Sequence, residues 1–431
     1  MRSLTLLLSL ALALPTLAEM VIFKNANVIP MTTNKVVEKQ SVIVRDGKID
    51  AIVAADAALP EGATVVDATG KYLIPGLAEM HGHLPPPNAP KGLLQDVFYL
   101  YLANGVTTVR GMLGHDGQIN LREWQKKGEI VAPNLYVAGP SFNGQSVTSV
   151  EQAIERVKTQ KKEGWDLIKI HPGLTKAEYD AVARTAKAEG IRFAGHVPEP
   201  VGLLNAIAAG HETFDHIDGY MEYVADGKGN IDAKKLADAV KRSKKANVWI
   251  VPTSALWEVL YNAIPLETLR AYPELKYVPQ QAVDSWSKMY EDRAKNVKPE
   301  DSKTFVANRA RLLRELHQGG VKILMGTDSP QQFSIPGFAL HRELERMRDA
   351  GMSSYEILKS GTVNVGQYFA RQDNFGTIEP GKRADLVLLS GNPLADITNT
   401  AKIDGVMVRG QWLDRKALDE HLGRISAKYL R

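Results

Sequence analysis

The stretch "LIPGLAEMHGHLP", residues 73–85, joins an apolar run to two histidines, His81 and His83, that stand one residue apart. In a strand, side chains alternate between the two faces, so residues i and i+2 point the same way. Both imidazoles would then face one site, and Gly82 between them has no side chain to crowd the opposite face. The pattern predicts a metal site with paired imidazoles, although two histidines in a polar loop would fit an isolated H-x-H equally well.

Downstream of this stretch, apolar segments alternate with helical segments such as "SVEQAIERVKTQKKEG" and "KAEYDAVARTAKAEG". With the strand that ends in the H-x-H pair there are eight, the others being "GVTTVRGM", "NLYVAGP", "DLIKIH", "RFAGHV", "TFDHI", "VWIVPTS" and "VKILMGTDS". Eight β/α units over residues 76–370 predict an α/β protein with a closed parallel (β/α)8 TIM barrel. A doubly wound open sheet is the alternative, but a glycine-rich nucleotide turn after the first strand is missing.

The two ends of the chain have a different sequence pattern. Runs rich in Val and Ile, divided by turn residues, occur in "MVIFKNANVIPM", "QSVIVRDGKIDAIVA" and "ATVVDATGKYLIPG", and again in "GTIEPGKRADLVLLSGNP" and "IDGVMVRGQWL". They predict antiparallel strands, with a hairpin at Asp46-Gly47. We expect residues 19–75 and 371–431 to pair into one small β-sandwich domain.

Residues 1–18, "MRSLTLLLSLALALPTLA", have a basic start, an apolar stretch and small residues before Glu19, which predicts a cleaved secretory signal peptide. The apolar run is shorter than a membrane span and contains Pro15, so we expect no stable membrane anchor. The chain has no cysteine, which suits a periplasmic or secreted protein without disulfides. A net charge of only +4 argues against a nucleic-acid partner, and a homo-oligomer is left open.

Polar residues end four of the other predicted barrel strands: Lys169 in "DLIKIH", His196 in "RFAGHV", His216 in "TFDHI" and Asp328 in "ILMGTDS". Catalytic side chains lie at the carboxyl ends of barrel strands, so these four and the H-x-H pair would lie together at the C-terminal face of the barrel. Each alone has an ordinary explanation: a structural histidine, an aspartate that caps a helix, or a lysine whose amine reaches solvent. The combination predicts a metal centre.

On these residues the chain resembles the metal-dependent amidohydrolase superfamily, in its imidazolonepropionase-like and prolidase-like branch. The matching pieces are "PGLAEMHGH", "GVTTVRGM", "LIKI", "AGHV", "FDHI", "GTD" and the closing "GTIEPGKRADLVLL", which together cover almost the whole mature sequence. The ligands that the resemblance implies are His81 and His83 for a buried metal, His196 and His216 for an exposed metal, and a carboxylated Lys169 that bridges both. Asp328 matches the aspartate of the last strand. Many relatives carry Glu-His where this sequence has Asp215-His216, which leaves every ligand in place.

Imidazole and carboxylate ligands suit two divalent ions, zinc first, with manganese or cobalt as alternatives. Two metals that share a water would yield hydroxide near neutral pH, and this hydroxide would attack the scissile carbonyl. Asp328 would serve as general base and then as general acid toward the departing nitrogen. Arg110, His171 and Tyr220 lie at or beyond strand ends and are candidates for substrate contact. Their respective alternatives are a structural ion pair, a hydrogen bond behind a ligand and a packed aromatic.

One connection, residues 256–320, is unusually long and carries Trp257, Tyr261, Trp286 and Tyr290. Loops after barrel strands rise from the catalytic face, so we expect this insertion to form a lid over the site. The alternative is helical padding in which the aromatic side chains pack among themselves, and we expect that packing for most of them.

The leading functional hypothesis is an exported amidohydrolase that cleaves a C–N bond, an amide or dipeptide bond, in a small-molecule or dipeptide substrate. The same site would serve a lactone, carbamate or phosphoester. A non-catalytic periplasmic binding protein is disfavoured, because a binder has no use for a bridging lysine or for Asp328. Fold and metals do not specify the substrate.

Overall fold

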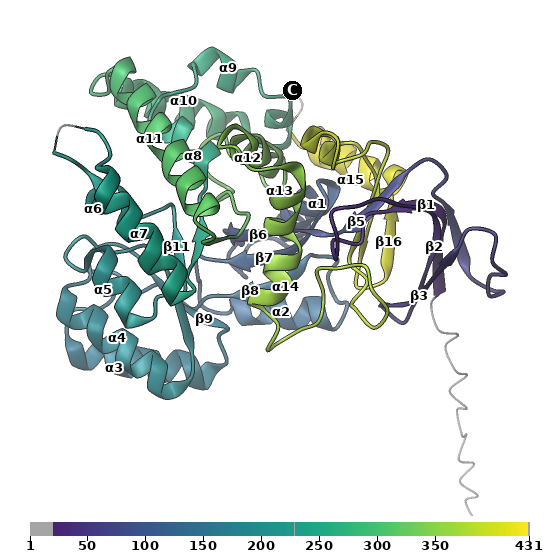
Figure 1. Cartoon of the computed structure of the whole chain (residues 1–431), viewed down its shortest axis with the longest axis horizontal. Helices are drawn as coiled ribbons and strands as arrows, with labels where there is room; N and C mark the ends of the chain where they lie inside the picture. The colour runs from purple at the N-terminus through teal and green to yellow at the C-terminus, as the bar shows by residue number, and fades with distance from the viewer. Residues whose placement is uncertain (1–19, 228, 430–431) are drawn as a thin grey trace, which may run out of the picture.

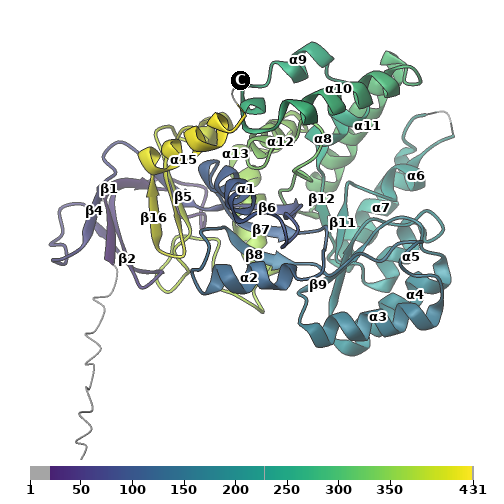
Figure 2. The same cartoon turned by 180° about the vertical axis from the view of Figure 1, so that it is seen from behind.

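The computed structural model describes residues 20–227 and 229–429, and the expected signal peptide at residues 1–18 lies outside this range. Two parts are visible in Figures 1 and 2: a β-rich part in which the purple N-terminal strands lie beside the yellow C-terminal segment, and a larger part of alternating strands and helices. None of the helices in the described ranges is long and apolar enough to cross a membrane.

Strands from both chain ends form one eight-stranded sheet in the order β16-β15-β14-β5-β1-β2-β3, with β4 paired to β1. The strands are β1 (Met20–Val28), β2 (Val37–Arg45), β3 (Lys48–Ala54), β4 (Thr64–Asp67), β5 (Tyr72–Pro75), β14 (Leu386–Leu389), β15 (Ile403–Val408) and β16 (Gln411–Asp414). The expected hairpin is present, since Arg45 pairs with Lys48 and both Asp46 and Gly47 have positive φ. Antiparallel pairing of β5 with β14 joins the two ends of the chain.

Side-chain alternation buries both faces of this sheet. Val21 and Phe23 of β1 pack into a cluster with Val42 of β2, whereas Ile22 packs with Ile43 on the opposite side. Pairing places all eight strands in a single sheet, where two stacked layers were expected.

The larger part contains all eight strands predicted for a barrel, and every pairing among them is parallel. One sheet has the order β6-β7-β8 and the other β13-β12-β11-β10-β9. The strands are β6 (Leu77–Gly82), β7 (Val106–Gly111), β8 (Asn134–Val137), β9 (Leu167–Ile170), β10 (Arg192–Gly195), β11 (Thr213–Asp215), β12 (Trp249–Val251) and β13 (Lys322–Ile323).

Backbone contacts link the two parallel sheets at both of their edges. A parallel bridge joins Ala138, just after β8, to Leu167 of β9. On the other side, Met80 N donates to Met325 O at 2.9 Å, and Asp328 N donates to His81 O at 2.8 Å. The carboxyl end of β6 therefore lies beside the segment that follows β13 and carries Asp328.

Helices separate successive strands of this part and pack their apolar faces inward. They are α1 (Lys91–Ala103), α2 (Gln118–Lys126), α3 (Val150–Glu163), α4 (Lys176–Glu189), α5 (Gly202–Ala209), α6 (Tyr220–Val224), α7 (Ala233–Ala246), α12 (Phe338–Asp349), α13 (Ser354–Gly361) and α14 (Val363–Tyr368). The sequence determines both ends of α4: Thr175 and Glu178 form a capping box at its start, and Gly190 ends it with φ 65°. η2 (Ile397–Ala401) and α15 (Arg415–Ala427) belong to the C-terminal segment.

The long insertion is helical throughout most of its length. It comprises α8 (Ser254–Leu260), α9 (Leu266–Arg270), η1 (Pro273–Tyr277), α10 (Gln280–Ala294) and α11 (Pro299–Gln318). Tyr261 stacks on Phe305 with 3.5 Å between ring centroids, and Trp286 and Tyr290 pack against a small apolar cluster within the insertion. Trp257 differs, since its ring centroid lies 6.1 Å from that of His216. Most of the aromatic side chains therefore serve the insertion's own packing.

Candidate metal centre

Three side chains from two strand ends form the core of the site. His81 and His83 come from the end of β6, and Asp328 follows β13. Each offers a ligand atom, and these atoms all lie within 4.8 Å of one another. Asp328 Oδ1 is 2.8 Å from His83 Nε2 and 3.6 Å from His81 Nε2. Three ligand atoms at these separations could hold a divalent cation.

Lys169 of β9 reaches the same point from the neighbouring sheet. Its side chain is fully buried, and Nζ lies 3.2 Å from His81 Nε2. Burial lowers the pKa of Lys169 to about 8. The amine thus lies beside an imidazole of the H-x-H pair, and Lys169 stands near the carboxyl end of its strand, as the sequence predicted.

His196 and His216, after β10 and β11, complete the group, with ring centroids 4.5 Å apart. His216 Nε2 lies 3.7 Å from Asp328 Oδ2, while its Nδ1 is 2.8 Å from Thr253 Oγ1. His196 Nδ1 lies 2.6 Å from Asp218 Oδ2. In each histidine one ring nitrogen is therefore held by the protein, which orients the other nitrogen. The six residues, called the ligand cluster below, are His81, His83, Lys169, His196, His216 and Asp328.

The donor set of the ligand cluster fits a metal. His83 Nε2, His216 Nε2 and Asp328 Oδ1 are buried and make no well-formed hydrogen bond in the described part of the chain, although His83 Nε2 and Asp328 Oδ1 lie 2.8 Å apart in an ion-pair contact. An unpaired buried polar atom is costly, and a bound cation would satisfy these acceptors. His216 and Asp328 also have φ of 63° and 65°, a left-handed conformation that non-glycine residues adopt at functional sites.

Arg110 corrects one expectation about substrate contact. Its side chain is fully buried, Nε donates to Met80 O at 2.6 Å, and Nη2 lies 3.3 Å from Asp215 Oδ1. The guanidinium therefore makes the structural ion pair that was its alternative. The same carboxylate reaches the ligand cluster, because Asp215 Oδ2 lies 2.8 Å from His81 Nδ1.

Tyr220 is also placed away from the ligand cluster. It is fully buried at the start of α6, and its hydroxyl lies 2.6 Å from Ser243 Oγ on α7. Burial raises the pKa of the phenol. The expected substrate contact is therefore wrong, and Tyr220 is the packed aromatic of the alternative.

His171 does lie beside the ligand cluster. Its ring stacks on that of His196 with centroids 5.1 Å apart, and it is partly exposed. Burial lowers the pKa of His171 to about 3, so its imidazole is neutral at neutral pH. A neutral imidazole at this place can exchange a hydrogen bond with a substrate.

Glu79 is a part of the site that sequence reasoning missed. Its fully buried carboxyl accepts hydrogen bonds from His81 N at 2.9 Å and Thr327 N at 2.8 Å, and so joins β6 to the segment that carries Asp328. Burial raises the pKa of Glu79 to about 8. The sequence does mark Glu79 as unusual, because it is the one charged residue in the apolar run "LIPGLAEM".

The profile of the amidohydrolase family matches residues 72–413, which include the whole ligand cluster. The chain belongs to the amidohydrolase family. This confirms the resemblance drawn from the motifs. Members of the family generally bind divalent metal, in agreement with the three ligand atoms that His81, His83 and Asp328 bring together.

Among curated amidohydrolase relatives, the chain is 21% identical over 420 residues to adenine deaminase 3 of Rhizobium meliloti (strain 1021), covering 92% of this chain and 58% of that protein. Adenine deaminase of Clostridium botulinum (strain Loch Maree / Type A3) is 22% identical over 409 residues, covering 91% and 57%. The chain thus spans less than two thirds of the length of these relatives.

The fold is similar to that of a solved bottromycin amidohydrolase, with a TM-score of 0.75 and 23% identity over 95% of this chain and 90% of that one. A Xaa-Pro dipeptidase with bound methionine has a TM-score of 0.69 and 21% identity, covering 92% of this chain and 100% of that one. At these identities the likeness concerns the fold alone.

Proposed function

We propose that this protein is a metal-dependent hydrolase of C–N bonds that acts on amides or dipeptides with two divalent ions, zinc first, in the ligand cluster. The observation that carries the proposal is the convergence of four histidines, a buried lysine and an aspartate at the carboxyl ends of parallel strands in a chain of the amidohydrolase family. We also propose that the two parallel sheets together make a closed (β/α)8 barrel, which their hydrogen bonds at both edges support.

The ligands divide into two groups around Lys169. His81 and His83 would hold one ion, and His196 and His216 the other. Lys169 would bridge them as a carbamate, formed when the uncharged amine adds CO2 and loses a proton. When bound, the ions would supply Lewis acidity toward the scissile carbonyl and lower the pKa of a water at the site.

Asp328 is the residue proposed to move the proton. Its two oxygens face different histidines, Oδ1 toward His83 and Oδ2 toward His216, so the carboxylate spans the centre of the ligand cluster. From there it can accept a proton from the attacking water and return it to the departing nitrogen. Because its backbone is held by the hydrogen bond to His81 O, the carboxylate is pre-positioned for both steps.

The proposed substrate class rests on similarity to a solved structure and on similarity to curated relatives. The solved Xaa-Pro dipeptidase favours dipeptides or N-acyl amino acids, and the size of that protein matches this chain. The curated adenine deaminases favour a second candidate, release of ammonia from an aminopurine, which is also C–N bond hydrolysis. We place the dipeptide candidate first because the deaminases extend well beyond the length that this chain spans.

One activity assay separates these candidates. Purified protein loaded with zinc, manganese or cobalt is assayed against dipeptides, N-acyl amino acids, adenine, lactones, carbamates and phosphoesters, with Asp328→Asn as the matched control. We expect turnover of dipeptides or N-acyl amino acids that the control lacks. Turnover of adenine alone would favour the second candidate, and turnover restricted to esters or lactones would refute C–N hydrolysis.

We propose that the protein is exported to the periplasm or the medium after removal of residues 1–18. Mass spectrometry of the protein isolated from its native host then finds an N-terminus at Glu19. An intact Met1 in the isolated protein would contradict export by this route.

A further inference from the structure

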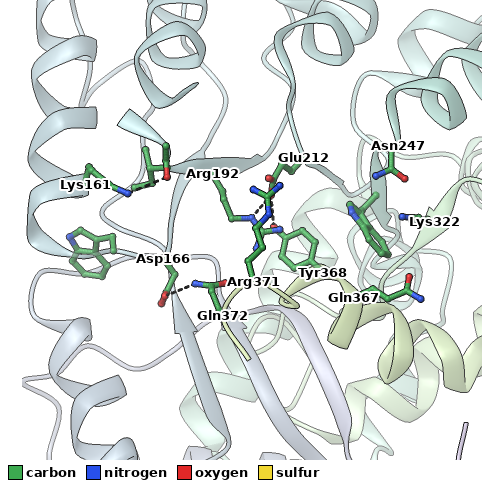
Figure 3. A pocket seen from close by; sticks show the side chains of 14 residues that line it. Lys161, Asp166, Arg192, Glu212, Asn247, Lys322, Gln367, Tyr368, Arg371 and Gln372 are labelled. Atoms are coloured by element: carbon green, nitrogen blue, oxygen red, sulfur yellow. Dashed lines mark hydrogen bonds and ion pairs between the residues drawn. The ribbon is translucent and has the colours of Figure 1, made fainter. Parts of the chain in front are cut away.

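A cavity lies at the end of the five-stranded sheet opposite the ligand cluster, and Figure 3 shows its lining. Its volume is about 470 Å³. Arg192, Trp249 and Lys322, which line it, are the first residues of β10, β12 and β13, whereas His196 and His216 follow the last residues of β10 and β11. Because these strands are parallel, this basal cavity and the ligand cluster lie at opposite ends of the sheet.

Cations outnumber carboxylates around the basal cavity. The charged lining residues are Lys161, Arg192, Lys322, Arg371, Asp166 and Glu212. Both carboxylates are already paired. Asp166 Oδ2 lies 2.8 Å from Nη1 of Arg122, which is not part of this lining, and Glu212 Oε2 lies 2.6 Å from Arg192 Nε.

Three of the cations are left without an acidic partner. Among the residues that the structure describes, none forms an ion pair with Lys161, Lys322 or Arg371. Lys161 Nζ donates to Gly190 O at 3.2 Å, and Lys322 Nζ lies 4.5 Å from the centroid of the Trp249 ring. In Figure 3, Lys161 and Lys322 lie on opposite sides of the cavity, with Arg371 between them.

We propose that the basal cavity binds a small polyanion that carries phosphate or carboxylate groups. The volume is within the range of small-molecule sites, about 300–1,000 Å³. Three unpaired cations around one hollow would each donate charge-assisted hydrogen bonds to such an anion. The amide side chain of Gln367 in the wall adds a neutral donor, whereas Gln372 Nε2 donates to Asp166 Oδ1 at 3.3 Å.

The competing explanation is that the cations serve only the fold. α3, α4 and α7 end at this side of the sheet, and cations near helix C-termini stabilise the helix dipole. Lys161 lies in the last turn of α3 and fits that explanation. Lys322 does not, because it begins β13, whereas Arg371 lies just beyond the C-terminal end of α14.

The test is isothermal titration calorimetry of the full-length protein with inorganic pyrophosphate and, separately, with citrate. The variants are Lys322→Gln, Arg371→Gln and the double variant, and the control is Lys416→Gln, which removes the same charge from an exposed position on α15. We expect at least one anion to bind, each single variant to weaken that binding roughly tenfold, and the control to match the wild type. Which anion binds more tightly identifies a phosphate or a carboxylate ligand.

Pyrophosphate and citrate can also bind to metal ions held in the ligand cluster. The titration is therefore repeated with Lys169→Ala, the variant expected to hold less metal there. Binding that persists in this variant and is lost in the double variant supports the basal cavity. Binding that is lost with Lys169→Ala but unchanged in the double variant would place the anion at the ligand cluster and overturn the proposal. Failure of both anions to bind the wild type would also overturn it, in favour of cations that serve only the helix ends.

Discussion

Asp215 Oδ2 lies 2.8 Å from His81 Nδ1, and the other oxygen of the same carboxylate lies 3.3 Å from Arg110 Nη2. All three side chains are fully or almost fully buried. Arg110 therefore balances the charge of Asp215, and the contact of Asp215 with Nδ1 leaves Nε2 of the His81 ring to face the ligand cluster. The ion pair beneath the ligand cluster thus positions one of the proposed metal ligands.

Asp215→Asn should lower metal affinity about 10–100-fold, because a carboxylate behind a ligating histidine fixes the ring and raises its basicity. Metal affinity is measured by competition with a chelator, on protein shown by circular dichroism to be folded. Asp292→Asn, a change at an exposed carboxylate, is the control. Affinity within twofold of the wild type would show that Asp215 does not position His81.

Tyr220→Phe should affect stability and leave substrate discrimination unchanged. The variant loses the hydrogen bond to Ser243, which predicts a loss of about 0.5–1.5 kcal/mol in the free energy of unfolding. Values of kcat/KM for N-acyl amino acids and for their C-terminal amides should keep the same ratio as in the wild type. A selective loss on the free acids would return Tyr220 to the substrate site.

Lys169→Ala should reduce bound metal and activity, with partial rescue by added acetate. A protonated amine cannot bind a cation, whereas a carbamate supplies anionic oxygens between the two histidine pairs. Metal content is measured by mass spectrometry after dialysis, beside Lys416→Ala as a control for loss of a lysine. Two retained metal ions per chain in Lys169→Ala would exclude the bridge.

Glu343→Gln should reduce the pH dependence of stability. Burial raises the pKa of Glu343 to about 7, above the ordinary value near 4.5, and its carboxyl accepts hydrogen bonds from Ser254 N and Ala255 N at the start of α8. Because the folded pKa is the higher one, the stabilisation is complete below about pH 4.5 and is lost as the pH rises through 7.

Urea unfolding at pH 5 and pH 8 measures this effect. The wild type should lose more stability than Glu343→Gln over this interval, by on the order of 2–3 kcal/mol. Glu291→Gln, at an exposed position, should behave as the wild type. Equal losses in Glu343→Gln and the wild type would mean that Glu343 is ionised in the folded protein throughout.

The eight parallel strands could be predicted because they are short buried runs, several of which are followed by a polar residue at the carboxyl end. The strand "LIKI" of β9 is buried at all four positions, and only Lys169 breaks its apolar character. The ligand cluster followed, since the carboxyl ends of parallel strands meet. The family match over residues 72–413 includes the matching pieces from "PGLAEMHGH" to "GTIEPGKRADLVLL".

The contacts behind the ligands could not be predicted in the same way. Arg110 and Asp215 are separated by 105 positions, and only the arrangement of the strands in space shows that the two side chains meet. Tyr220 was misplaced because its position just beyond the end of a predicted strand suggested that it contacts the substrate. Gly219, with φ 79°, instead begins α6 and turns the phenol toward α7.

Anomalous X-ray diffraction at the zinc edge, from crystals of the zinc-loaded protein, tests the central claim most directly. We predict two peaks, one beside His81 and His83 and one beside His196 and His216, with density for a carboxylated Lys169 between them. Zinc bound elsewhere, or the ligand cluster without a peak at saturating zinc, would contradict it.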